Sequence, residues 1–306
     1  MKTTNLLRLL TVAVFASVIA VSCQKDKSED LSPQEEQEAS MAASQSEAES
    51  EAIFNSIFDD VMGTNNEVGL AGTGIFGGAA QTDIGIASRP GQVDSIPSCL
   101  IITVTRPTAN LFPVRIELDF GTGCFVRGHM RSGKIITEYT NRLIFPGAVA
   151  TTVFQNYKID SISIQGTHKI TNTSTSNMRQ FTVEIRNARL TRPNGSYSEW
   201  NRNRVITQIE GLGTPEIHID DVFRITGDAW GTVSRNNLVT TWESVIIDPL
   251  IKRFNCRWIV RGEVKIIRRN QSSNSPWIGY LKYGTGTCDN LAILTVNGVD
   301  HQITLH

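Results

Sequence analysis

Apolar and polar residues alternate with a period of two over most of the chain from about residue 96 to its end. The runs Phe181–Arg186 and Arg204–Thr207 are typical, and both contain Val, Ile and Thr. Such alternation is typical of strands with one face toward the core. Turn signals separate the runs. Asn194-Gly195 and Asn297-Gly298 favour two-residue hairpins, because a type I′ turn needs positive φ at both central residues.

Ten or more strands joined by hairpins are expected from this pattern. They predict an all-β fold, an antiparallel hairpin meander over residues 96–306. A sandwich, an open curved sheet and a barrel all remain compatible with it. Gly128, Gly166, Gly227 and Gly262 lie inside strand-like runs, where glycine usually marks a bulge or a bend.

The pattern before residue 96 is different. Apolar residues recur at helical spacing between residues 51 and 62, which predicts a short amphipathic helix, and Gly63 is well placed to end it. Residues 63–95 are expected to form a Gly-rich linker. Residues 23–50 are rich in Ser, Glu, Gln and Ala and contain no aromatic residue, so they bury too little apolar surface to offset the entropy of ordering. We expect them to form an acidic flexible tether, or stalk.

The first 22 residues have the three parts of a secretory signal peptide. Lys2 and Arg8 supply positive charge, and Leu9–Val21 is an apolar run too short to span a bilayer, which takes about 20 apolar residues. Small residues then lead to Cys23. This junction resembles the bacterial lipobox, with Ala20 in place of the usual Leu. It predicts cleavage after residue 22 and lipid attachment at Cys23, where more than one acyl chain gives stable anchoring.

The short charged run after Cys23, residues 24–30, resembles the export tag of Bacteroidota surface lipoproteins. With the all-β pattern and the closing segments Tyr283–Asn290 and Thr295–Gly298, the chain resembles an uncharacterised Bacteroidota surface lipoprotein family over most of residues 97–306. The resemblance implies an outer-membrane, lipid-anchored location, with the cell surface as one of the two possible faces. It implies no activity and no functional residues.

Four cysteines remain in the exported part of the chain: Cys99, Cys124, Cys256 and Cys288. Thiols tend to pair in an oxidising compartment, and four cysteines allow three connectivities. A weak internal repeat favours one of them. Cys99 begins a strand-like run and Cys124 follows the next run and a Gly-Thr-Gly turn, and Cys256 and Cys288 stand in the same relation. We therefore expect the disulfides Cys99–Cys124 and Cys256–Cys288, against the alternative of four reduced thiols.

Charge is unevenly distributed along the chain. Residues 24–62 contain 11 acidic and 2 basic residues, whereas residues 63–306 contain 19 acidic and 25 basic residues. The basic residues of the second part are spread over many predicted strands and do not form one block. This distribution favours a solvated surface, and we expect no nucleic-acid partner.

Motifs for catalysis or metal binding are weak. Glu216, His218 and Asp220 would share one face of a strand and could seat a divalent ion, but the polar face of an amphipathic strand has the same pattern, and we favour that reading. Gly128–Lys134 has the P-loop spacing, yet Ile135 stands where a hydroxyl residue is needed and the following run predicts a strand. We expect no catalytic residue, no metal site and no cofactor.

These observations together predict a non-enzymatic module that is anchored to the membrane through Cys23 and binds a glycan, a partner protein or another envelope component. Exposed aromatic residues could stack on sugars, and Tyr197, Trp200, Trp230 and Trp242 are the candidates, although most of them are expected in the core. Two alternatives remain. One is an envelope hydrolase whose site is assembled from separated strands, and the other is a purely structural envelope protein.

Overall fold

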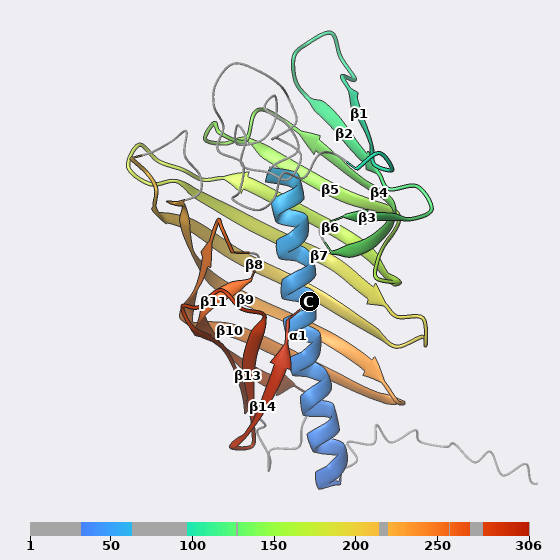
Figure 1. Cartoon of the computed structure of the whole chain (residues 1–306), viewed down its shortest axis with the longest axis vertical. Helices are drawn as coiled ribbons and strands as arrows, with labels where there is room; N and C mark the ends of the chain where they lie inside the picture. The colour runs from blue at the N-terminus through green and yellow to red at the C-terminus, as the bar shows by residue number, and fades with distance from the viewer. Residues whose placement is uncertain are drawn as a thin grey trace, which may run out of the picture.

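A long helix lies across one face of a large antiparallel sheet in the computed structural model of the protein (Figure 1). The structure describes residues 32–62, 97–126, 128–213, 220–256, 258–269 and 278–305. These ranges contain one helix, α1 (Pro33–Met62), and fourteen strands. The strands are β1 (Ile101–Thr105), β2 (Val114–Asp119), β3 (Cys124–Val126), β4 (His129–Tyr139), β5 (Val149–Ile159), β6 (Ile162–Asn172), β7 (Gln180–Thr191), β8 (Tyr197–Glu210), β9 (Val222–Arg235), β10 (Leu238–Arg253), β11 (Ile259–Arg269), β12 (Ile278–Thr285), β13 (Leu291–Val296) and β14 (Val299–Thr304).

The order of strands in the sheet follows the order of the chain. All pairs are antiparallel, and β3 alone stands off the main path, paired with β4. β1 and β14 are the two edges, so the sheet is open. The predicted all-β antiparallel meander is confirmed, and of the three arrangements left open by the sequence the structure has an open sheet, which curves round α1 (Figure 1).

The apolar and polar residues that alternate in the sequence also alternate in burial along the strands. In β7, Phe181, Val183 and Ile185 are buried, and the residues between them are half-buried. The predicted bulges also occur. The β6–β7 register shifts at Gly166, whose φ is +117° and where a Cβ would lie 2.7 Å from the Cα of Ala188. Only glycine fits there, since both the backbone conformation and the close approach exclude a side chain.

The helix is far longer than the sequence pattern indicated. It begins at Pro33, and Ser32 caps it, because the Ser32 N–H donates to Glu35 Oε2 (2.9 Å) and the Glu35 N–H donates to Ser32 Oγ (3.3 Å). The predicted helix bounds of 51–62 are therefore wrong, and so is the flexible tether over residues 33–50. Small residues such as Ala39 and Ala43 pack in this half of the helix, so it needs no large apolar side chain to be buried.

One core lies between α1 and the sheet. Phe54 is at its centre, with its ring centroid 5.5 Å from that of Trp200 and 6.2 Å from those of Phe154 and His168. His168 is fully buried, and burial lowers its pKa to about 3, so it is neutral and serves as a packing group. No helix of the described residues is long and apolar enough to cross a membrane.

Both predicted disulfides are confirmed. Cys99–Cys124 joins the segment before β1 to β3, with the two Cα atoms 5.5 Å apart. Cys256–Cys288 joins the segments before β11 and after β12, with the Cα atoms 5.7 Å apart. Several other expectations fall outside the described residues: the signal peptide 1–22, Cys23, residues 24–31, the linker 63–95, and Glu216 and His218 of the weak metal pattern.

Candidate functional site

Carboxylates of α1 face the sheet and are held there by buried donors. The Glu47 carboxylate accepts hydrogen bonds from Trp200 Nε1 (2.7 Å), Trp242 Nε1 (3.2 Å) and the Ser244 hydroxyl (2.8 Å). All four residues are buried. Trp200 and Trp242 are thus core residues whose polar edges bind the helix, and they do not form a sugar platform.

The next turn of α1 carries a buried ion-pair cluster. Glu51 accepts from Arg202 Nη1 (3.0 Å) and Arg204 Nη2 (3.0 Å), and from the amide of Asn55 (3.2 Å). Burial alone would raise the pKa of Glu51, but the two guanidinium groups overcome it and hold the pKa below its usual value. Burial lowers the pKa of Arg202 to about 10 although Glu51 opposes the change, so Arg202 stays charged near neutral pH.

The C-terminal end of α1 is tied to the opposite flank of the sheet. Asp60 and Arg131 form an ion pair (Oδ2–Nη1 2.6 Å) in which neither side chain is exposed. Arg131 also donates to Ser56 Oγ (2.9 Å), and the Tyr139 hydroxyl donates to the carbonyl of Val61 (2.8 Å). These contacts set which turn of α1 meets which strand, because a charged group one turn out of place would be left buried without its partner.

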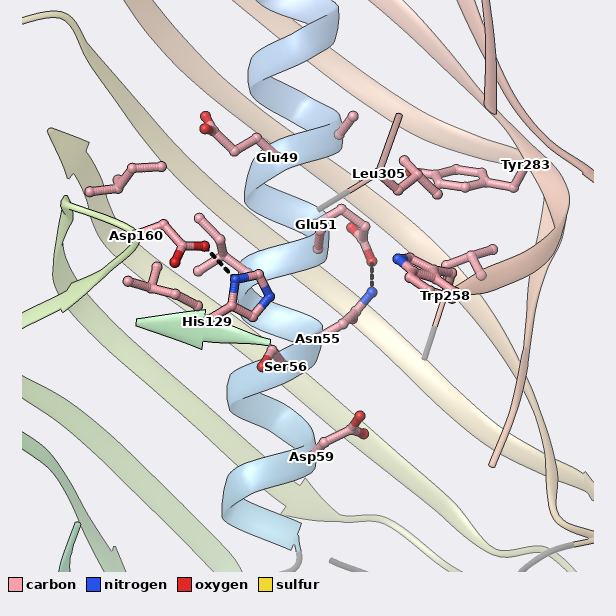
Figure 2. A pocket seen from close by; sticks show the side chains of 16 residues that line it. Glu49, Glu51, Asn55, Ser56, Asp59, His129, Asp160, Trp258, Tyr283 and Leu305 are labelled. Carbon is pink, nitrogen blue, oxygen red and sulfur yellow. Dashed lines mark hydrogen bonds and ion pairs between the residues drawn. The ribbon is translucent and has the colours of Figure 1, made fainter. Parts of the chain in front are cut away.

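A cavity of about 180 Å³ lies along α1, and Glu51 and Asn55 of the ion-pair cluster are among its lining residues. Ala48, Ala52 and Ser56 are among the helix residues that line it, at the spacing of one helix face. The two flanks of the curved sheet supply the walls. Figure 2 shows His129 and Asp160 on one side of the helix and Trp258 and Tyr283 on the other.

His129 and Asp160 form a pair at one wall of this cavity. His129 begins β4, and Asp160 occupies the turn between β5 and β6 with a positive φ of 45°. The Nδ1 atom of His129 contacts Asp160 Oδ2, and Asp160 Oδ1 accepts from the Met130 N–H (2.9 Å). The carboxylate therefore fixes the orientation of the imidazole ring, as a general base or a hydrogen-bonding ligand group would require.

The other wall contains an unsatisfied donor. The hydroxyl of Tyr283 is buried and makes no hydrogen bond with any described residue. Burial, together with the nearby carboxylates of Glu51 and Glu47, raises the pKa of Tyr283 well above its usual value, so the hydroxyl keeps its proton. Leaving such a group unpaired costs about 1–3 kcal/mol.

A second cavity of about 440 Å³ adjoins the first along α1, because Ala48, Glu49 and Leu305 line both. Its other walls come from the β7–β8 turn, the end of β9 and the C-terminal strand. The lining of this cavity is rich in amide, hydroxyl and guanidinium groups, namely those of Gln45, Asn194, Ser196, Gln302, Thr304, Arg192 and Arg235. We call the two cavities together the α1 groove.

Sequence reasoning did not identify the α1 groove. Of the residues singled out in the sequence, Asp220 is described but lines neither cavity, and the four cysteines form structural disulfides away from it. Trp230 and Tyr197 are half-buried strand residues that also lie outside the groove. Among the described residues no group of three or more His, Cys, Asp or Glu side chains has an arrangement suited to a metal ion.

Comparisons with protein-family models, with curated proteins and with solved structures gave no significant match.

Proposed function

We propose that the protein is a lipid-anchored lipoprotein of the bacterial outer membrane, facing either the periplasm or the cell surface, whose β body binds a glycan chain in the α1 groove without catalysis. The observation that carries the proposal is the pair of adjoining cavities along one face of α1. A groove of this shape fits an extended ligand better than a single compact one.

The lining of the groove favours sugars. The inner cavity, at about 180 Å³, is slightly larger than the ~150 Å³ cavity that accepts one benzene ring, so it has the size of a single ring. Trp258 and Tyr283 give it aromatic surface. The larger cavity offers amides and guanidinium groups, which can donate to many hydroxyl oxygens at once.

The proposed anchor places the groove near the membrane. Eight residues separate Cys23 from Ser32, and a chain of that length spans at most about 29 Å. The N-terminal end of α1 would therefore lie close to the bilayer that holds the lipid. A ligand in the groove would be an envelope or surface polysaccharide within reach of that position.

Replacement of Cys23 by Ser is expected to abolish lipid attachment and to release the protein from the membrane. The motivation is the junction at Ser22-Cys23, since the thiol is the only group there that can carry a thioether-linked lipid. Metabolic labelling with a fatty-acid analogue, followed by membrane fractionation, measures both effects. Ser28→Ala is the control and should label like the wild type. Equal label in Cys23→Ser and the wild type would refute the anchor.

Replacement of Ala52 by Trp should fill the inner cavity and reduce glycan affinity at least about tenfold, because the new indole occupies the space of one ring. A glycan array probed with full-length protein in detergent first identifies a ligand, and calorimetry then compares the variants. Val239→Trp, at a position that is already 63% exposed and outside the groove, is the matched control. Failure of the folded wild type to bind any glycan, or equal affinity in Ala52→Trp, would contradict the proposal.

A second candidate function is hydrolysis of the bound glycan or of a group attached to it. The His129–Asp160 pair favours it, because an imidazole held by a carboxylate can take a proton from water. The same array ligand distinguishes the two functions. Products that appear with the wild type and not with His129→Asn would replace the binding proposal by an enzymatic one.

A further inference from the structure

A third cavity, of about 360 Å³, lies on the face of the sheet that α1 does not cover. Trp242 and Ser244 of β10 point toward α1, so Glu243 between them points away from it. Trp230 on β9 and Ile267 on β11 are the cross-strand partners of Glu243 and share its face. The next row on this face is Asp228, Val245 and Lys265.

The position of Trp230 is unusual for a residue with a purely structural role. α1 is the only helix of the described residues, and it lies on the opposite face, so no second layer of the described chain covers the indole. The guanidinium group of Arg186 lies over the indole ring, with its carbon 5.7 Å from the ring centroid. A large aromatic side chain on the open face of a sheet, beside a hollow, indicates a binding surface.

Charged groups of both signs surround the indole. Glu243 and Arg269 form an ion pair (Nε–Oε2 2.6 Å), and Asp228 accepts from the amide of Asn203 (3.1 Å). Lys265 lines the same cavity. Hydrogen-bond donors and acceptors are therefore both present around one aromatic ring. A ligand with many hydroxyl groups and an apolar ring face could bond to these groups and stack on the indole.

We propose that this hollow is a second glycan-binding site, which is independent of the α1 groove and takes one sugar unit of a polysaccharide stacked on Trp230. A protein partner fits less well, since the centres of protein interfaces are depleted of charged residues. A nucleic acid also fits less well, because phosphates need a surface of one sign and Asp228 and Glu243 would repel them. Two sites on opposite faces of the sheet would let one protein hold two chains or two parts of one chain.

Affinity electrophoresis of full-length protein in non-ionic detergent tests this site. The probes in the gel are xylan, mannan, mixed-linkage β-glucan and alginate. At least one of them should retard the wild type, and Trp230→Ala should raise the apparent dissociation constant about tenfold, the size expected for one lost stacking contact. Trp230→Phe keeps an aromatic face and should fall between the two. Val239→Ala, exposed on β10 outside the hollow, should migrate like the wild type.

The controls separate this site from the α1 groove. Ala52→Trp should still be retarded, through Trp230, whereas Trp230→Ala should still bind the array ligand of the groove. Thermal unfolding shows which variants are folded. If Trp230→Ala does not fold, Trp230→Phe decides the test. Retardation of folded Trp230 variants equal to that of the wild type overturns the inference. So does the lack of retardation by every probe, or the capture of one envelope protein by a photocrosslinking residue at position 245.

Discussion

A chain that lacks residues 33–62 is expected to lose its cooperative unfolding transition. Removal of α1 would leave Arg131, Arg202 and Arg204 of the sheet without carboxylate partners, and all three side chains are fully buried in the intact protein. Water would solvate these groups once α1 is gone, so the larger loss is the apolar core, where each large side chain returned to water costs about 1.5–3 kcal/mol and a whole domain has only about 5–15 kcal/mol of stability. The core between α1 and the sheet contains many such side chains, Phe54 and Trp200 among them, so their exposure exceeds what the sheet can supply.

Thermal unfolding, followed by near-ultraviolet circular dichroism, measures this effect. The control is deletion of residues 24–31 alone, which lie before the helix and its cap, and this variant should unfold at the wild-type temperature. A synthetic peptide of residues 32–62, added to the refolding helix-deleted chain, should restore the transition. A helix-deleted chain that keeps a sharp transition by itself would show that α1 is an appendage and not part of the core.

The sheet could be predicted from the sequence because a meander depends on local patterns. Alternation along runs such as Phe181–Arg186 fixes which side chains face the core, and turns such as Asn194-Gly195 and Asn297-Gly298 join neighbouring strands. The disulfide pairing followed for the same reason, since each bond closes a segment of 25 or 32 residues within one repeat. Neither prediction required knowledge of contacts between distant parts of the chain.

The first half of α1 could not be predicted by the same means. Its buried face consists of Ala39, Ala43 and serines, which have no apolar periodicity, and its burial depends on the sheet that receives it. One signal was present in the sequence. Arg202 and Arg204 occupy the same alternate positions of β8 as the core residues Trp200 and Ile206. Cations on the inner face of a strand require buried carboxylates, and the acidic segment before residue 62 was the obvious source.

The α1 groove has no signal in the sequence at all. His129 and Asp160 are 31 residues apart, and Tyr283 comes from the far end of the chain. They meet only because the sheet curves round a helix, and curvature arises from twist and bulges summed over many strands. Neither a motif nor a local pattern encodes that sum.

Replacement of Glu51 by Ala is expected to lower the free energy of unfolding by about 3–5 kcal/mol, because Arg202 and Arg204 would each lose a hydrogen-bonded partner in a fully buried position. Chemical denaturation at pH 7 measures the change. Glu49→Ala is the matched control two residues away. Its ion pair with Arg192 is partly exposed, so its loss should cost no more than about 1 kcal/mol.

The dependence on pH has a defined sign. The pKa of Glu51 lies below its usual value of 4.5 in the folded protein, since the two arginines outweigh burial. The ionised carboxylate therefore contributes stability above the unfolded pKa, and this contribution is lost as the pH falls through the folded pKa. The difference in stability between the wild type and Glu51→Ala should shrink in acid below about pH 4.5. A difference that stayed constant down to pH 3 would show that the charge on Glu51 does not matter.

The joint replacement of Glu51, Arg202 and Arg204 by Met should be milder than Glu51→Ala, because it removes the two guanidinium groups that Glu51→Ala leaves buried without this partner. Glu47 would lose its ion pair with Arg204 but keep its three neutral donors from Trp200, Trp242 and Ser244. What the triple variant should lose is the register of α1, since the small residues of its first half pack equally well one turn away. Spin labels at the exposed positions Glu38 and Val239 measure this by electron resonance, and the distance distribution should be broader than in the wild type. An equally narrow distribution in a stable triple variant would mean that the ion pairs of Glu51 do not set the register, which would then depend on shape and on the Asp60–Arg131 pair.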